Sequence, residues 1–147
     1  MTRFRFRLEA ALRLRRMAAE AESEKLRNLM LQRQKLENSL KTVGEERVAA
    51  SASVQRPDGV RSVDLRALSS FILGLEARTR TLSEALCRVN IQITEQRKRL
   101  LRAEQDERSL DKLRAKRLTE WELNSAREIE NTAQELWLLS HTRNTEA

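Results

Sequence analysis

The chain has few of the residues that bend a backbone or fill a globular core. Its 147 residues include one proline, three glycines, one cysteine and no tyrosine, and aromatic residues make up only 3%. A globular core needs bulky side chains, whereas a seam between two helices needs only apolar residues at its a and d positions. Charged residues make up 35% of the chain. The composition therefore favours long solvated helices over a globular domain.

The chain also lacks the residue groups that carry chemistry. Cys87 is the single cysteine, so no internal disulfide can form, and His141 is the single histidine. There is no glycine-rich phosphate loop and no sequence cluster with the spacing of a metal site. No apolar run is long enough for a secretory signal or a membrane-spanning helix. The sequence thus predicts a soluble protein of a reducing compartment, with no catalytic residue, no metal and no cofactor.

What is present instead is a heptad pattern. From Leu65 to Leu100, alternating steps of three and four residues meet apolar side chains at every position except Thr79 and Gln96. The same stepping over residues 8–50 meets nine apolar positions out of thirteen. A period near 3.5 residues keeps one apolar stripe on a helix and winds it around a partner helix. Two coiled-coil helices are therefore predicted.

A turn separates the two stripes. Pro57 disfavours helix at its own position and at the residue before it, and Gly59 can supply a positive φ. Ser62 is the predicted N-cap of the second helix, with Asp64 in its first turn beside the positive helix end. The sequence predicts an all-α fold, a long two-helix antiparallel coiled-coil hairpin with a C-terminal helical overhang.

The predicted boundaries make one coiled-coil domain over 1–147. Helix one covers about 5–50, a loop covers about 51–62, and helix two covers about 63–141. The register that brings the two stripes together pairs the following residues: Arg15 with Gln96, Leu26 with Leu86, Val43 with Leu68, and Leu8 with Glu104.

This register leaves part of helix two without an internal partner. The overhang covers about 105–141 and is roughly 55 Å long at about 1.5 Å per residue. Leu118, Trp121, Ile129 and Leu136 give it an apolar stripe. An open stripe of this kind indicates that helix one extends further back, that the protein self-associates, or that another protein docks there.

The net charge of +7 has its clearest centre at the start of the chain. Arg3, Arg5 and Arg7 alternate there with two phenylalanines, a pattern suited to phosphate, an anionic membrane or an acidic protein surface. A basic coiled coil that binds nucleic acid is one interpretation. Against it, the cations of helix two alternate with acids and form no one-sided stripe with stacking aromatics.

Four segments, residues 4–15, 71–76, 110–117 and 131–136, together with their order along the chain, resemble the FliJ family of flagellar export proteins. The opening at residues 4–15 is similar to the start of the family, and residues 71–76 match the aromatic and leucine segment that follows its loop. The charged segments 110–117 and 131–136 look like the family's end. The resemblance covers nearly the whole chain.

The resemblance implies a cytoplasmic component of the flagellar type III export apparatus, peripheral at the cytoplasmic face of the inner membrane. Such proteins look like the central stalk of a rotary ATPase. The implied partners are the hexameric flagellar export ATPase, the cytoplasmic domain of the export gate, and export chaperones. A stalk protein of a virulence secretion system is an alternative, because the same coiled-coil features would be expected of it.

The family's gate-binding patch lies near the hairpin tip, and the matching residues are Phe71, Leu75, Arg78, Leu82 and Val43. The expected register places Leu75 and Leu82 in the seam and Phe71 beside it. By the same analogy the ATPase ring meets the end where both termini lie. The residues expected there are Arg3, Arg5, Arg7, Trp121, Ile129 and Leu136.

Overall fold

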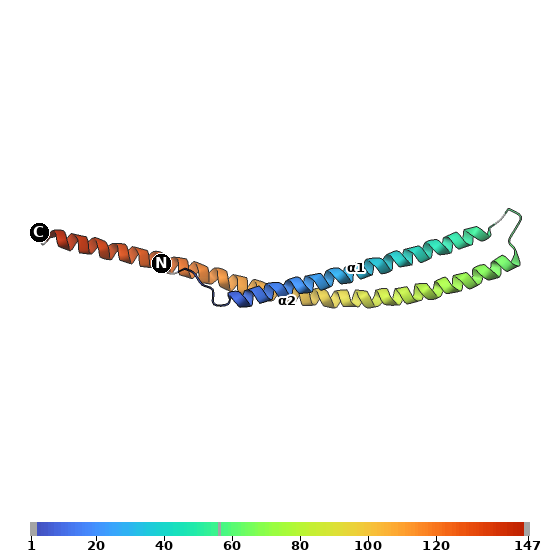
Figure 1. The fold of residues 1–147 in the computed structure, drawn as a ribbon, viewed down its shortest axis with the longest axis horizontal. Helices are drawn as coiled ribbons and strands as arrows, with labels where there is room; N and C mark the ends of the chain where they lie inside the picture. Colours follow the sequence, from blue (N-terminus) through green and yellow to red (C-terminus); the bar gives the residue numbers. More distant parts are fainter. Residues whose placement is uncertain (1–2, 56, 146–147) are drawn as a thin grey trace. The chain divides into compact units, whose positions relative to one another are not determined.

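The computed structural model describes residues 3–55 and 57–145, most of which form two long helices (Figure 1). Helix α1 runs over Glu9–Val54 and helix α2 over Ser62–Thr145, and the described residues contain no strand. Alanine, leucine, glutamate, lysine and arginine dominate both helices and favour this conformation. The helices pack against each other as a hairpin, which confirms the predicted fold class.

Helix α1 begins later and ends later than predicted. The segment before Glu9 is not helical, and the Glu9 amide donates to the Phe6 carbonyl at 3.2 Å. The predicted start near residue 5 is therefore wrong. At the other end α1 continues past residue 50, where small side chains fit the helix easily. The Ser51 and Ser53 hydroxyls donate to carbonyls of the preceding turn.

The turn residues act much as their chemistry indicates, with one correction. Gly59 has a φ of 101°, a conformation that L side chains rarely adopt. Asp64 lies in the first turn of α2 as predicted. The Leu65 amide donates to the Arg61 carbonyl at 3.1 Å. The Arg61 carbonyl therefore accepts the first hydrogen bond of α2, which makes Arg61 the N-cap residue. Ser62, the predicted N-cap, is instead the first residue of the helix.

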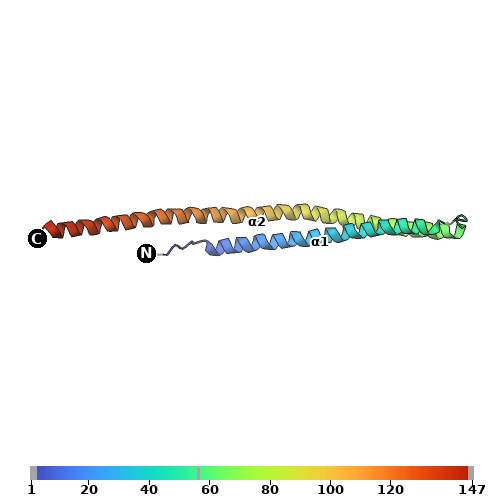
Figure 2. The same ribbon diagram turned by 90° about the horizontal axis from the view of Figure 1, so that it is seen from above.

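The chain divides into two compact units. The first comprises Met1–Ala19 and Arg102–Ala147, and the second comprises Glu20–Leu101. In the second unit α1 lies alongside α2 in both views (Figures 1 and 2). Side chains of both helices form its seam, and the most buried are Val43, Leu75, Val89, Ile93 and Gln96. In the first unit Leu12 is fully buried.

The pairing register is shifted from the prediction by one heptad or more. Gln96 contacts Glu22, which lies seven residues after the predicted partner Arg15. Arg15 instead pairs with Asp106 at 3.3 Å. Near the tip the ion pairs Arg47–Glu76 and Arg78–Glu46 show a shift in the same direction, by more than one heptad. The apolar stripes match equally well after a slide of seven residues, so hydrophobic pattern alone does not choose between the two registers.

The new register shortens the uncovered part of α2. Asp106, Asp111 and Arg114 all contact the start of α1, and Trp121 contacts Phe4. The predicted overhang from about 105 is therefore wrong in its first half. Every side chain from residue 126 to residue 143 is exposed, and this C-terminal stretch, 126–143, is the part of the predicted overhang that remains open.

Candidate interaction surfaces

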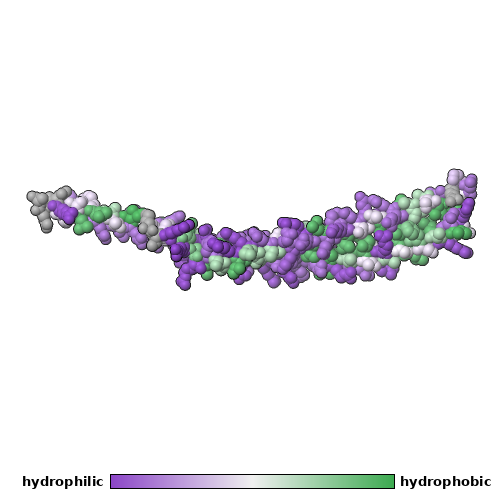
Figure 3. Space-filling view, viewed as in Figure 1, coloured by the Kyte–Doolittle hydropathy of each residue, from purple (hydrophilic) through white to green (hydrophobic). Residues whose placement is uncertain are grey.

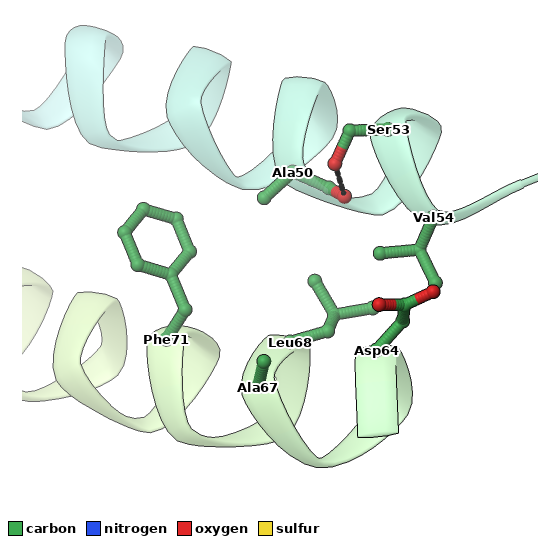
Figure 4. A pocket seen from close by; sticks show the side chains of 7 residues that line it. All are labelled: Ala50, Ser53, Val54, Asp64, Ala67, Leu68 and Phe71. Atoms are coloured by element: carbon green, nitrogen blue, oxygen red, sulfur yellow. Dashed lines mark hydrogen bonds between the residues drawn. The ribbon is translucent and has the colours of Figure 1, made fainter. Parts of the chain in front are cut away.

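An open recess of about 310 Å³ lies between the helices close to the hairpin tip (Figure 4). It exists because the facing residues are small. Ala50 and Ser53 of α1 and Ala67 of α2 leave a space that the Phe71 ring borders without filling. Figure 3 shows apolar surface in the same region of the hairpin. The Asp64 carboxylate adds one acidic group to the lining.

The structure separates the residues that were predicted to bind the export gate. Phe71 is 47% exposed and available for contact. Val43 and Leu75 are buried in the seam, and Leu82 is half-buried. These three side chains hold the two helices together, and they expose little surface that a partner could contact.

Arg78 is exposed and its guanidinium lies 3.1 Å from the Glu46 carboxylate. It therefore presents a partly neutralised charge beside Phe71. Sequence reasoning missed several exposed apolar residues near the tip, because the heptad pattern marks only the seam. These residues are Val48, Val60, Val63 and Leu65, of which Leu65 was assigned to the seam.

The N-terminal segment, residues 3–8, lies along α2 in the first unit. Phe4 and Phe6 are half-buried and Arg3, Arg5 and Arg7 are exposed. This alternation is typical of an extended chain, which points successive side chains to opposite sides. The Phe4 and Trp121 rings lie 6.0 Å apart at 56°.

The N-terminal segment and α2 enclose a recess of about 730 Å³, lined on the α2 side by Leu113, Arg117, Glu120, Trp121 and Asn124. Trp121 was predicted to be an unpaired contact for the ATPase ring. Its indole is instead half-buried beneath the chain's own phenylalanine. The Arg–Phe alternation was visible in the sequence, but only the corrected register brings it opposite Trp121.

Ion pairs hold the start of α1 against α2. With their N–O distances they are Arg15–Asp106 (3.3 Å), Arg16–Glu107 (3.4 Å), Arg16–Asp111 (2.9 Å) and Arg114–Glu9 (3.1 Å). All are partly exposed, and such pairs contribute about 0–1 kcal/mol each. Together these ion pairs favour one pairing register, because sliding one helix along the other would break all of them at once. Among the described residues, none forms an ion pair with Arg3, Arg5 or Arg7, which leaves these cations for a partner.

One polar contact lies inside the seam of the second unit. Gln96 is only 5% exposed, and its side-chain amide donates to the Glu22 carbonyl at 3.0 Å and to the Glu22 carboxylate. This hydrogen bond, followed by the one from Lys25, lowers the pKa of the Glu22 carboxyl below its usual value. A buried polar contact of this kind favours one register over others.

A sequence profile described as flagellar FliJ protein matches residues 4–144. The chain belongs to the FliJ family. Comparisons with curated proteins and with solved structures gave no match. The match covers the N-terminal segment from Phe4 onwards, the residues that line the tip recess, and the C-terminal stretch.

Membership of the FliJ family gives the chain a role related to flagellar export. Two observations limit the chemistry of this FliJ protein within the described part of the chain. No group of three or more histidine, cysteine or acidic side chains there could hold a metal ion. No helix over residues 3–55 and 57–145 is long and apolar enough to cross a membrane.

Proposed function

We propose that this FliJ protein is a non-enzymatic component of the flagellar type III export apparatus that couples the export ATPase to the membrane export gate. It works in the cytoplasm, at the cytoplasmic face of the inner membrane. The hairpin tip contacts the cytoplasmic domain of the gate, and the end that carries the termini contacts the ATPase hexamer. Export chaperones are further partners.

The observation that carries this proposal is the open C-terminal stretch. Ile129 and Leu136 are 51% and 63% exposed, in the part of α2 that no other described segment covers. Exposed apolar side chains at helical spacing support a protein contact there. Arg3, Arg5 and Arg7 add exposed positive charge in the same unit. Trp121 is left out of the proposed contact because it is half-buried against Phe4.

The proposal is tested by ATP hydrolysis of the purified flagellar export ATPase with and without this protein. We expect stimulation and a complex that co-elutes in size-exclusion chromatography. Ile129→Ser with Leu136→Ser should abolish both effects. Leu138→Ser should not, because Leu138 is equally exposed but lies on the other side of the helix. Full stimulation by the double variant would exclude this stretch as the ATPase contact.

The contact with the export gate has a separate test. Phe71 borders the tip recess and is the exposed member of the predicted patch. Phe71→Ala should weaken binding to the cytoplasmic domain of the gate by about tenfold or more, as expected for an aromatic residue at the centre of an interface. Leu73→Ala is the matched control, because Leu73 is 64% exposed and lies about 200° further round the helix.

Binding of nucleic acid is a second candidate, which the exposed Arg3, Arg5 and Arg7 favour. The rings of Phe4 and Phe6 are turned toward α2 and are poorly placed to stack on bases. If nucleic acid is a partner, affinity for DNA should fall steeply with salt. Absence of DNA binding at low salt would remove this candidate.

A further inference from the structure

The C-terminal stretch continues the face of α2 that carries the half-buried Leu118. At about 100° per residue, Ile129 and Leu136 lie within about 20° of Leu118 on the helix surface. Leu118 is half-buried, whereas Ile129 and Leu136 are exposed. Figure 3 shows apolar surface on this part of the chain. One apolar stripe thus runs from a covered region into an uncovered one.

Acidic side chains border the uncovered stripe. Glu128 and Glu135 lie about 100–120° from the stripe on one side, and Glu130 lies about 100° from it on the other. Arg127 lies about 160° away, on the opposite surface of the helix. Within the described residues, none of these three glutamates forms an ion pair. The flanks of the stripe therefore carry uncompensated negative charge.

In the part of α2 that α1 covers, acidic side chains form ion pairs with arginines of α1. Around the start of α1, the α2 acids Asp106, Glu107 and Asp111 pair with arginines of α1. Those arginines already form ion pairs, so they cannot also pair with the acidic side chains of residues 126–143. A helix that covers the C-terminal stretch must bring its own apolar stripe and its own cations.

We propose that residues 126–143 bind an amphipathic helix of a partner protein whose apolar seam is flanked by lysine or arginine. This helix lies on the stripe of Ile129 and Leu136, which continues the face of the half-buried Leu118. Its cations pair with Glu128 and Glu135 on one flank and with Glu130 on the other. The inference concerns the chemistry of the contact and does not depend on the proposed coupling to an ATPase.

The test uses the full chain and two labelled peptides of three heptads each. Both peptides carry leucine at a and d; one carries arginine at e and g and the other carries glutamate there. Fluorescence anisotropy should show that the arginine peptide binds at least about tenfold more tightly, because reversing several exposed charge pairs turns attraction into repulsion. Glu128→Lys, Glu130→Lys and Glu135→Lys together should reverse this preference.

Matched variants separate the stripe from the rest of the helix. Ile129→Ser with Leu136→Ser should abolish binding of the arginine peptide, and Leu138→Ser and Arg127→Glu should leave it unchanged. Circular dichroism checks that each variant stays helical. Equal affinity for the two peptides, or a preference that survives the three charge reversals, would overturn the proposal.

The competing occupant is a second copy of this chain. Static light scattering over a range of concentrations tests it. A dimer of the unmodified protein that the Ile129→Ser and Leu136→Ser variant loses, and the Leu138→Ser variant retains, would assign the stripe to self-association and overturn the proposal. A monomer at all concentrations together with selective peptide binding would support it.

Discussion

Replacing Gln96 with leucine should loosen the pairing register of the hairpin. The Gln96 amide is buried in the seam and donates to Glu22 of the facing helix. A slide of one heptad moves the two about 10 Å apart and leaves the amide without this acceptor. A buried donor without a partner costs about 1–3 kcal/mol, which disfavours the slipped register by about 5- to 150-fold. Gln96→Leu removes this penalty.

Disulfide trapping can measure the change in register. In a Cys87→Ser background, Val43→Cys with Leu75→Cys reports the observed register, where both positions are buried. Val43→Cys with Leu68→Cys reports the slipped one. A disulfide requires Cα atoms within about 7 Å, and a slide of about 10 Å cannot satisfy both pairs. We expect only the first pair to cross-link in the otherwise unmodified protein, and the second to appear once Gln96 is leucine.

Thr79→Leu is the control for this experiment. Thr79 is the other polar residue in the same stripe, but its hydroxyl donates to Leu75 of its own helix at 2.9 Å. Its replacement should leave the register unchanged. If Gln96→Leu gives no cross-link between positions 43 and 68, then the ion pairs and the turn determine the register, and the role assigned to Gln96 is wrong.

Three further predictions concern acid stability, the turn and the N-terminal segment. The hydrogen bond from Gln96 lowers the pKa of Glu22 below 4.5 in the folded chain, so its contribution to stability is complete above about pH 4.5 and is lost as the pH falls through the lowered pKa. Thermal melts of Glu22→Gln should therefore show a smaller loss of stability in acid, and an unchanged loss would contradict this. Gly59→Ala should destabilise the chain by about 1 kcal/mol because of its positive φ, whereas Gly74→Ala, in open space within α2, should stabilise it by about 0.5–1 kcal/mol in denaturant titrations. Equal effects of the two glycine variants would refute the turn argument. Phe4→Ser should uncover an indole and shift tryptophan emission to longer wavelength, and an unshifted spectrum would contradict the ring contact.

The sequence predicts the two helices and the turn well, because both signals are local. Heptad spacing defines a helix and its apolar stripe, and Pro57 with Gly59 interrupts them. The register was not predictable in the same way. A seven-residue repeat matches itself after every heptad, so only specific contacts such as Gln96 with Glu22 distinguish the alternatives.

Errors in the candidate site follow from that one ambiguity. The predicted register left Trp121 without a partner, and the observed one brings it to Phe4. Phe71 was expected beside the seam and is found half exposed there. The recesses at the tip and beneath the N-terminal segment depend on which small and large side chains face each other. Such pairings are properties of the folded chain and have no signature in a single sequence.

The repeating seam also sets the step in which this hairpin can change length during evolution. Deleting one heptad from α1 and the facing heptad from α2 keeps both stripes in phase and shortens the hairpin by about 10 Å. Deleting a single residue from one helix alone turns the rest of its stripe away by about 100°. Relatives that span a different gap between two partners should therefore differ by paired insertions or deletions of seven residues.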